Sequence, residues 1–373
     1  MAYSTRRTSH ESTANINTNS GNCRTSSIDN GVNSGTITSS RHFSMDNSIG
    51  SYVQATVIAQ GPPVAFYGSC VIGDIFYIHG GIRIRGDRAP SNRMFMFHRN
   101  TWTEITTDES PALSYHRCVV MRNGQYIVTI GGWDGSKRKS DVHVYDVANA
   151  TWYQASAPGF PTGGGLNNHA VIPMKSNDAA VLVIGRDGSL RTQRKHGDAY
   201  CLRGDPAKRN FRWEQYPIAV DSRSGHSLIG HGSSLYIIGG RADHLIQQYT
   251  GLPVENQNIC NSLYSDLKQM MKSNEISPMK KLPSTRKDHT SVPCGSDLAF
   301  VYGGETFDGK QREPSNEIFV VTLGAHGQWY NLGQIEFGRQ GHTMVCLGDR
   351  IIVHGGLGKT GVCGETFLID LIR

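Results

Sequence analysis

Short runs of apolar, β-branched residues recur along the chain, and each run stops at glycine. The clearest run spans residues 126–130 and is followed by Gly131 and Gly132. An apolar run that halts at two glycines is typical of a buried strand followed by a sharp turn. A weaker copy, residues 181–184, ends at Gly185 and Arg186. Four further runs end at glycine pairs: Gly80 and Gly81, Gly239 and Gly240, Gly303 and Gly304, and Gly355 and Gly356.

The spacing of these turns is regular. The first glycines stand at positions 80, 131, 185, 239, 303 and 355, so successive steps are 51, 54, 54, 64 and 52 residues. A strand-rich repeat of about 50 residues indicates a β-propeller, in which each repeat forms one blade. The six turns therefore predict an all-β fold with six blades.

The first strand after residue 50 has no partner in its own neighbourhood. Residues 52–55 match residues 152–155, the closing strand of the second repeat, in an aromatic residue, Gln and Ala. The last repeat ends at residues 369–373 without a closing strand of this kind. We therefore expect the N-terminal strand to complete the final blade, which leaves no exposed sheet edge between the two ends of the ring.

The longest interval between turns contains an insertion, residues 241–281, in the fourth blade. It includes four apolar residues at helical spacing, Leu263, Leu267, Met270 and Met271. Ser262 is placed to cap the start of this predicted helix. We expect the apolar stripe to pack on the rim of the propeller, and a helix that docks a partner is the alternative.

Residues 1–48 are rich in Ser, Thr, Asn and Gly and are predicted to be disordered, which leaves residues 49–373 as the propeller domain. No apolar run approaches the roughly 20 residues needed to cross a bilayer, and no signal-peptide core follows the N-terminus. The 8 cysteines stand singly. We expect a monomeric cytoplasmic protein with reduced thiols, and nuclear, cytoskeletal or ciliary association stays open.

Several residues of the repeat resemble those of a known family. An Arg or Ser followed by His precedes the first strand of several blades, and Tyr145, Asp146 and Trp152 close the second repeat. Together with the glycine pairs, these residues are similar to the kelch-repeat family over about residues 51–373. The resemblance implies a six-bladed propeller that serves as a protein-binding platform, with no attached catalytic domain and no cofactor.

Histidine recurs before the first strand of five blades, as His116, His169, His226, His289 and His342. A residue needed once per blade is expected to serve the blade, as a neutral imidazole that bonds the glycine-turn backbone. His79 and His354 precede glycine pairs and are expected to pack. We predict no metal site among these histidines.

A cationic pattern is the main candidate for a binding site. Arg223, Arg286 and Arg339 precede the first strands of the last three blades, near one mouth of the central channel. Loops that follow the glycine turns should open on the same face. They carry Arg83, Arg85, Arg88, Lys137, Arg138, Lys139, Arg186 and Arg191. Arginine clusters suit carboxylates or phosphates, so we expect an acidic or phosphorylated segment of another protein there. The alternative is a solvated rim whose arginines bond neighbouring backbone.

The resulting functional hypothesis is a non-enzymatic adaptor or scaffold that uses this basic loop face. A net charge of +6 is too mild to predict nucleic-acid binding, and we expect no membrane partner. One alternative is a substrate-recognition subunit of a ubiquitin ligase, which should carry a BTB domain or a cullin-binding helix. Residues 1–48 are too short and polar for a BTB domain. A propeller enzyme is the other alternative, but no catalytic constellation supports it.

Overall fold

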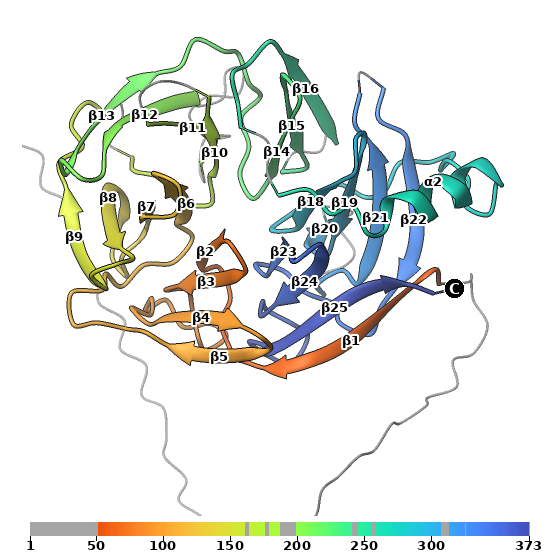
Figure 1. Cartoon of the computed structure of the whole chain (residues 1–373), viewed down its shortest axis with the longest axis horizontal. Helices are drawn as coiled ribbons and strands as arrows, with labels where there is room; N and C mark the ends of the chain where they lie inside the picture. Colours follow the sequence, from red (N-terminus) through yellow and green to blue (C-terminus); the bar gives the residue numbers. More distant parts are fainter. Residues whose placement is uncertain are drawn as a thin grey trace, which may run out of the picture. The chain divides into compact units, whose positions relative to one another are not determined.

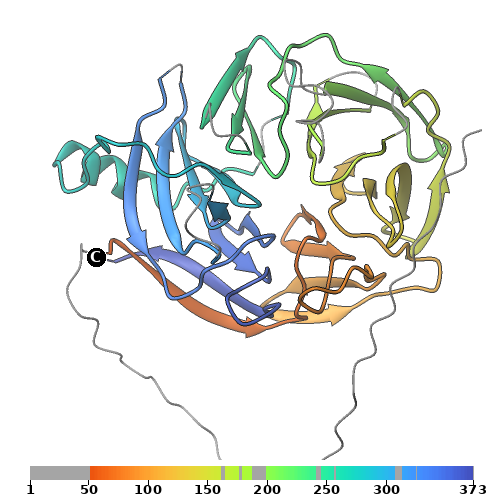
Figure 2. The ribbon, with the colours of Figure 1, turned by 180° about the vertical axis from the view of Figure 1, so that it is seen from behind.

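Six antiparallel sheets follow one another around a ring in the computed structural model of the protein (Figure 1). Figure 2 shows the same ring from behind. The structure describes residues 51–160, 164–175, 179–186, 199–240, 245–255, 258–306, 313–324 and 326–372. The predicted disordered tail, residues 1–48, lies outside the described residues.

The first three blades have four strands each. Blade 1 consists of β2 (Gly68–Ile72), β3 (Ile75–His79), β4 (Met94–His98) and β5 (Thr101–Glu104). Blade 2 consists of β6 (Arg117–Met121), β7 (Tyr126–Trp133), β8 (Arg138–Asp146) and β9 (Thr151–Ala155). Blade 3 consists of β10 (Ala170–Met174), β11 (Ala180–Ile184), β12 (Ala199–Asp205) and β13 (Asn210–Gln215).

The last three blades vary more. Blade 4 has three strands within the described residues, β14 (Ser227–His231), β15 (Ser234–Ile238) and β16 (Ile246–Thr250). Blade 5 consists of β18 (Thr290–Cys294), β19 (Leu298–Tyr302), β21 (Glu317–Thr322) and β22 (Trp329–Gln334). Blade 6 consists of β23 (Thr343–Leu347), β24 (Arg350–His354), β25 (Glu365–Leu371) and β1 (Val53–Gln60). A short ribbon joins β17 (Arg286–Lys287) to β20 (Glu305–Thr306). The chain thus has the all-β, six-bladed architecture that the repeats predict.

The core lies between the blades because each sheet is buried on both faces. Val128 and Ile130 of β7, for example, pack with Val181 and Val183 of β11 between blades 2 and 3. All five residues of β11 are buried, which explains why the sequence reads as unbroken apolar runs. The first strand of each blade contacts the first strands of both neighbours, so these six strands surround the central channel.

The two ends of the propeller meet in blade 6. Strand β1 pairs antiparallel with β25, from Val53 opposite Leu371 to Gln60 opposite Glu365, with an irregularity between Val57 and Ala59. Beyond the ladder, the Ile372 N–H donates to the Tyr52 carbonyl at 2.9 Å. The outer strand of the last blade therefore comes from the start of the domain, and backbone hydrogen bonds hold the two ends together.

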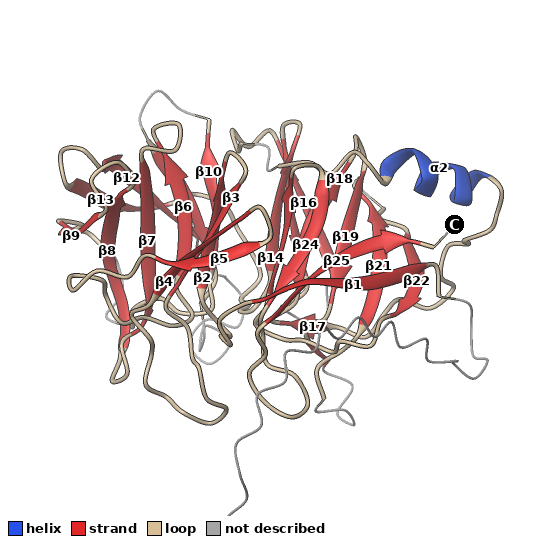
Figure 3. Cartoon of the chain, turned by 60° about the horizontal axis from the view of Figure 1, so that its bottom comes forward, coloured by secondary structure: helices blue, strands red, loops and turns tan. Residues whose placement is uncertain are grey.

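The two faces of the ring differ. The glycine-turn face is the face where the first strand of each blade begins and where the second strand of each blade reaches its glycine turn. On the opposite face, here called the hairpin face, the first and second strands are joined by hairpins. Figure 3 shows helix α2 (Tyr264–Lys272) on one side of the strands and β17 on the other. Within the described ranges no helix is long and apolar enough to cross a membrane.

The insertion of blade 4 crosses the hairpin face. The Glu255 N–H donates to Pro173 O of blade 3 at 2.9 Å, and the Cys260 N–H donates to Pro293 O of blade 5 at 3.0 Å. Helix α2 follows, with Leu267 and Met270 buried against the core of blades 5 and 6. The predicted cap was wrong. Ser262 Oγ makes no cap hydrogen bond and instead donates to Asp349 O at 2.6 Å, because this segment docks on blade 6.

Candidate functional site

The glycine turns bring each blade into close contact with the next. At Gly303 the backbone has φ +73°, and an added Cβ would lie 2.5 Å from the Arg339 carbonyl oxygen of the following blade. The Gly304 N–H donates to that same oxygen at 2.7 Å. A side chain here would be strained by the positive φ and would collide with the neighbouring backbone. The glycine pairs therefore serve the junctions between blades.

The repeated histidines pack into the same junctions. All five are buried, and the rings of His289 and His342 lie against Gly239 and Gly303 of the preceding blades. Burial, with a smaller contribution from a neighbouring arginine charge, lowers the pKa of His289 and of His342 to about 3. The imidazoles are therefore neutral at physiological pH. Blade 1 carries Tyr67 at this place, and its hydroxyl donates to His354 O at 2.7 Å.

The other two histidines lie in the same layer. His79 is buried, with Nδ1 at 3.0 Å from His116 Nε2 and Nε2 at 3.2 Å from Ser110 Oγ. His354 Nδ1 lies 2.9 Å from Thr366 Oγ1, and its ring centroid lies 4.2 Å from that of Trp102. Both side chains therefore have partners within the propeller, as expected from packing.

The three arginines before the first strands of blades 4, 5 and 6 are buried. Arg286 Nη1 donates to Gly303 O at 2.9 Å, and Nη2 to Glu317 Oε2 at 3.1 Å. Arg339 Nη2 donates to Glu365 Oε2 at 3.0 Å. Both acidic residues are the first residues of third strands. Both arginines therefore bond the third strand of their own blade, and Arg286 also ties that strand to the glycine turn.

Arg223 occupies the same place in blade 4. Its Nη1 donates to Gly239 O at 3.0 Å, and its Nη2 donates to Oε1 of Gln247 in the third strand of the same blade. A glutamate before the apolar residues of β21 and β25 is visible in the sequence. This repeated acid is the signal that could have identified the partners of the arginines.

The structure corrects the expected accessibility of four predicted binding residues. Arg223 and Arg286 are 0% exposed, because neighbouring carbonyls and side chains of the same blade surround them. Arg339 and Arg186 are also buried. None of the four presents an open guanidinium to a partner. Arg223, Arg286 and Arg339 each bond a neighbouring backbone carbonyl, as the alternative interpretation expected. Arg191 lies outside the described residues.

The remaining predicted cations lie in exposed loops of the glycine-turn face. Lys137 and Arg138 are exposed, whereas Lys139 forms an ion pair with Asp141 at 2.7 Å. Trp133 Nε1 donates to the Arg88 carbonyl at 3.2 Å and so joins this loop to the loop of blade 1. We call the exposed residues of the two loops the basic loop surface. It consists of Arg83, Ile84, Arg85, Arg88, Lys137 and Arg138.

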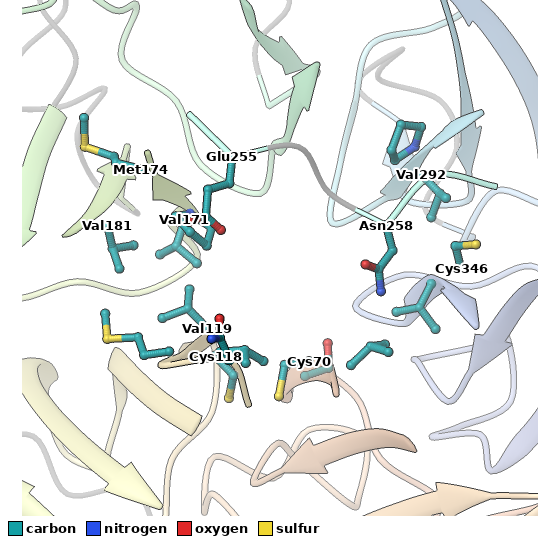
Figure 4. A pocket seen from close by; sticks show the side chains of 18 of the residues that line it. Cys70, Cys118, Val119, Val171, Met174, Val181, Glu255, Asn258, Val292 and Cys346 are labelled. Carbon is teal, nitrogen blue, oxygen red and sulfur yellow. The ribbon is translucent and has the colours of Figure 1, made fainter. Parts of the chain in front are cut away.

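A second candidate is the part of the central channel toward the hairpin face. This cavity has a volume of about 540 Å³. Figure 4 shows apolar side chains from several blades facing it, among them Val119, Val171 and Val292. Glu255 and Asn258 of the insertion stand beside the cavity in the same view, and Glu255 is the only carboxylate among the described residues that line it.

Two of the thiols that line the channel, Cys70 and Cys118, are poor nucleophiles. Burial raises the pKa of Cys118 to about 12 and also raises the pKa of Cys70. Nucleophilic and metal-binding cysteines act as thiolates, which these environments disfavour. The lining therefore favours binding of an apolar group over acid–base catalysis. Sequence reasoning missed this cavity, because the insertion reaches it only through the tertiary fold.

Comparison with known proteins identifies the family. A domain described as the KLHDC2/KLHL20/DRC7 Kelch-repeats domain matches residues 31–240, more than half of the chain. The chain belongs to the kelch-repeat family. Members of this family typically act as protein-interaction platforms, which is the coarse function that the resemblance implied.

Among similar kelch proteins is Kelch domain-containing protein 9 of Homo sapiens, 27% identical over 314 residues. That match covers 80% of this chain and 88% of the human protein. Kelch-like protein 36 of Mus musculus is 27% identical over 192 residues, 50% of this chain and 29% of its own length. The solved structure titled "Structure of YjhT" has a TM-score of 0.60 at 13% identity. It covers 84% of this chain and 99% of that chain, and this likeness concerns the fold alone.

Proposed function

We propose that this protein is a non-enzymatic cytoplasmic adaptor that binds an acidic segment of another protein through its basic loop surface. Kelch propellers bind other proteins, which supports the general class. The seven described cysteines are free thiols, which suits a reducing compartment. The alternative of a ubiquitin-ligase substrate receptor would use the same kind of surface, so the experiment below also examines that possibility.

The observation that carries the proposal is the position of Ile84. Its side chain is 65% exposed, the highest value among the large apolar residues that are exposed. Arg83 and Arg85 flank it, and both are exposed. An apolar side chain among arginines offers one hydrophobic contact together with several donors for carboxylates. A segment that presents an apolar residue between acidic ones complements this arrangement.

Hydrogen bonds within each loop fix the conformation in which its cations are exposed. Asp134 Oδ1 accepts the N–H groups of Ser136 and Lys137, each at 2.8 Å, and this turn presents Lys137. In the neighbouring loop, Asp87 Oδ1 accepts the Ala89 N–H at 2.9 Å. Both acids are thus engaged within their own loops. The surface carries five exposed cations against these two acidic residues, and this positive excess of charge would steer an acidic partner toward the face.

The test is affinity purification of the full chain from cell extract, followed by identification of bound proteins. The variant Arg83→Glu/Lys137→Glu reverses two charges on the surface. Lys280→Glu/Lys281→Glu is a matched control, because it makes the same charge change at exposed residues of the insertion. We expect the first variant to lower partner recovery by about tenfold, which corresponds to 1.4 kcal/mol, and the control to retain it.

Equal recovery of specific partners by the wild-type protein and by Arg83→Glu/Lys137→Glu would contradict binding through the basic loop surface. Loss of these partners in Lys280→Glu/Lys281→Glu alone would indicate that the insertion, and not the basic loop surface, binds them. Recovery of a cullin scaffold with the wild-type protein would favour the ubiquitin-ligase alternative. Ile84→Ser adds an independent measurement, because it removes the apolar contact without changing charge.

A further inference from the structure

Three elements distant in the sequence place sulfur and carboxylate ligands together on the hairpin face. Cys260 comes from the insertion, Cys346 from β23 of blade 6, and Asp349 from the turn between β23 and β24. The sulfur atoms of both cysteines and a carboxylate oxygen of Asp349 all lie within 4.8 Å of one another. Cys260 is 0% exposed and Cys346 is 7% exposed, whereas Asp349 opens to solvent.

Backbone contacts hold this group in place. The Asn261 N–H donates to Asp349 Oδ1, and Ser262 Oγ donates to Asp349 O at 2.6 Å. Cys260 Sγ lies 3.6 Å from the Asp349 carbonyl oxygen. The residues on both sides of the cluster are therefore positioned by hydrogen bonds, which leaves the second carboxylate oxygen of Asp349 as an available ligand beside two sulfurs.

Packing alone does not account for the carboxylate. A buried thiol packs as a small apolar group and needs no acid beside it. Asp349 has φ +59°, a left-handed conformation that aspartate tolerates, and one of its carboxylate oxygens accepts the Asn261 N–H. Neither local role uses the second carboxylate oxygen. A carboxylate beside two buried sulfurs and open to solvent on one side is the arrangement of a metal site with an entry path.

The distances suit a thiophilic divalent cation. With Zn–S bonds of about 2.3 Å in a tetrahedron, two ligand sulfurs stand about 3.8 Å apart. The three ligand atoms here lie within 4.8 Å of one another. Side-chain rotations that shift these atoms by about 1 Å or less would bring them to the distances of a zinc site. Two thiolates and a carboxylate favour zinc over calcium or magnesium, which prefer oxygen ligands alone.

We propose that Cys260, Cys346 and Asp349 bind one Zn²⁺ ion, with a fourth position open to solvent. The ion joins the insertion of blade 4 to the first strand and hairpin of blade 6, two segments that blade 5 separates in the sequence. The site is independent of the basic loop surface, which is on the opposite face. Its effect is to fasten the insertion that borders the channel.

The experiment uses the full chain, reduced and freed of metal by a chelator. Co²⁺ serves as the spectroscopic probe, because thiolate ligands give a sulfur-to-cobalt charge-transfer band in the near ultraviolet. Zn²⁺ is then added to displace Co²⁺, and bound metal is counted by elemental analysis. We expect one ion per chain and a higher midpoint of thermal unfolding with Zn²⁺, because a ligand that binds only the folded state stabilises it.

Variants separate the site from adventitious binding. Cys260→Ser and Cys346→Ser should lose the charge-transfer band and the zinc-dependent shift of the unfolding midpoint. Cys363→Ser is the matched control, because Cys363 is a free thiol whose Sγ lies 3.4 Å from Gly361 O on the glycine-turn face. Asp349→Asn should fold normally, since its amide oxygen still accepts the Asn261 N–H. Loss of a group that only hydrogen-bonds a metal ligand lowers metal affinity by roughly 10- to 100-fold. Asp349→Asn removes a ligand itself, so it should lower the zinc affinity by more than this.

Three results would overturn the proposal. The first is a reduced wild-type chain that gives no charge-transfer band with Co²⁺. The second is an unchanged band in correctly folded Cys260→Ser or Cys346→Ser. The third is an unchanged zinc affinity in Asp349→Asn, which would remove the carboxylate from the site. Circular dichroism of every metal-free variant establishes that each one is folded before the metal measurements are compared.

Discussion

The glycine-turn face and the hairpin face of the propeller are built in different ways. On the glycine-turn face the same contacts recur around the ring, with a glycine pair, a buried histidine and, in three blades, a buried arginine. On the hairpin face, one insertion contacts blades 3, 5 and 6 through residues that occur only once. Residues that recur from blade to blade therefore serve the blade itself. Candidate chemistry is better sought among residues that the repeat does not explain.

The arginines illustrate this lesson most clearly. Arg286 and Arg339 looked like binding residues because they recur near the channel mouth, yet each bonds a glutamate of its own blade. Cys260 and Asp349, in contrast, belong to no repeated pattern and meet only on the hairpin face. The four predictions below test this division between repeated structural contacts and single contacts, beginning with the largest expected effect.

The largest effect is expected for Arg286→Ala on the glycine-turn face. The substitution leaves the Gly303 carbonyl and the Glu317 carboxylate without their buried donor, and it opens a cavity. Breaking a buried pair by removing one partner costs about 3–5 kcal/mol. The free energy of unfolding in urea measures the loss. Lys137→Ala, at an exposed loop position, should change it by less than about 0.5 kcal/mol, and similar losses in both variants would contradict a structural role for Arg286.

On the hairpin face, Leu267→Ala should destabilise the protein by about 3 kcal/mol, because a buried leucine of α2 leaves a cavity when truncated. Gln269→Ala is the control within the same helix, since Gln269 is exposed and alanine favours helices. Thermal unfolding of both variants provides the measurement. If Leu267→Ala behaves like Gln269→Ala, the insertion does not share the cooperative core.

Acid should weaken the glycine-turn face through its buried histidines. His289 has a pKa of about 3 in the folded protein against 6.5 when exposed, so the unfolded chain binds more protons between these values. Its stabilising contribution is complete above about pH 6.5 and falls as the pH drops toward 3. At pH 5 the loss amounts to about 2 kcal/mol for this residue. Urea unfolding at pH 7 and pH 5 should show a smaller decrease in His289→Gln, and an equal decrease would refute the assignment.

The smallest expected effect is the difference in stability between alanine substitutions at two glycines that both have positive φ. Gly303→Ala would place a Cβ 2.5 Å from the Arg339 carbonyl oxygen, whereas Gly348→Ala on the hairpin face meets nothing within 4 Å. Backbone strain is common to both substitutions, so their difference isolates the collision between blades. We expect Gly303→Ala to cost about 1–2 kcal/mol more in unfolding free energy. Equal costs would show that the blades adjust freely at this junction.

Much of the fold was predictable because the repeat is local and regular. Unbroken apolar runs such as residues 181–184 indicate strands buried on both faces, and Gly131 with its equivalents indicates where they end. The candidate site was predicted less well. Lys137 and Arg138 are exposed as expected, but Arg223 and Arg286 are buried. Their partners include the Gly239 carbonyl, 16 positions from Arg223, and the Glu317 carboxylate, 31 positions from Arg286.

The number of blades, the glycine turns and the neutral, structural character of the repeated histidines follow from local sequence patterns. These features depend on short periodic patterns, and every repeat reports them again. Only the tertiary structure decided which cations are exposed, how the insertion borders the channel, and that Cys260 meets Cys346 and Asp349. Such contacts join segments far apart in the sequence, for example Cys260 and Asp349 at a separation of 89 residues, and no local pattern reports them.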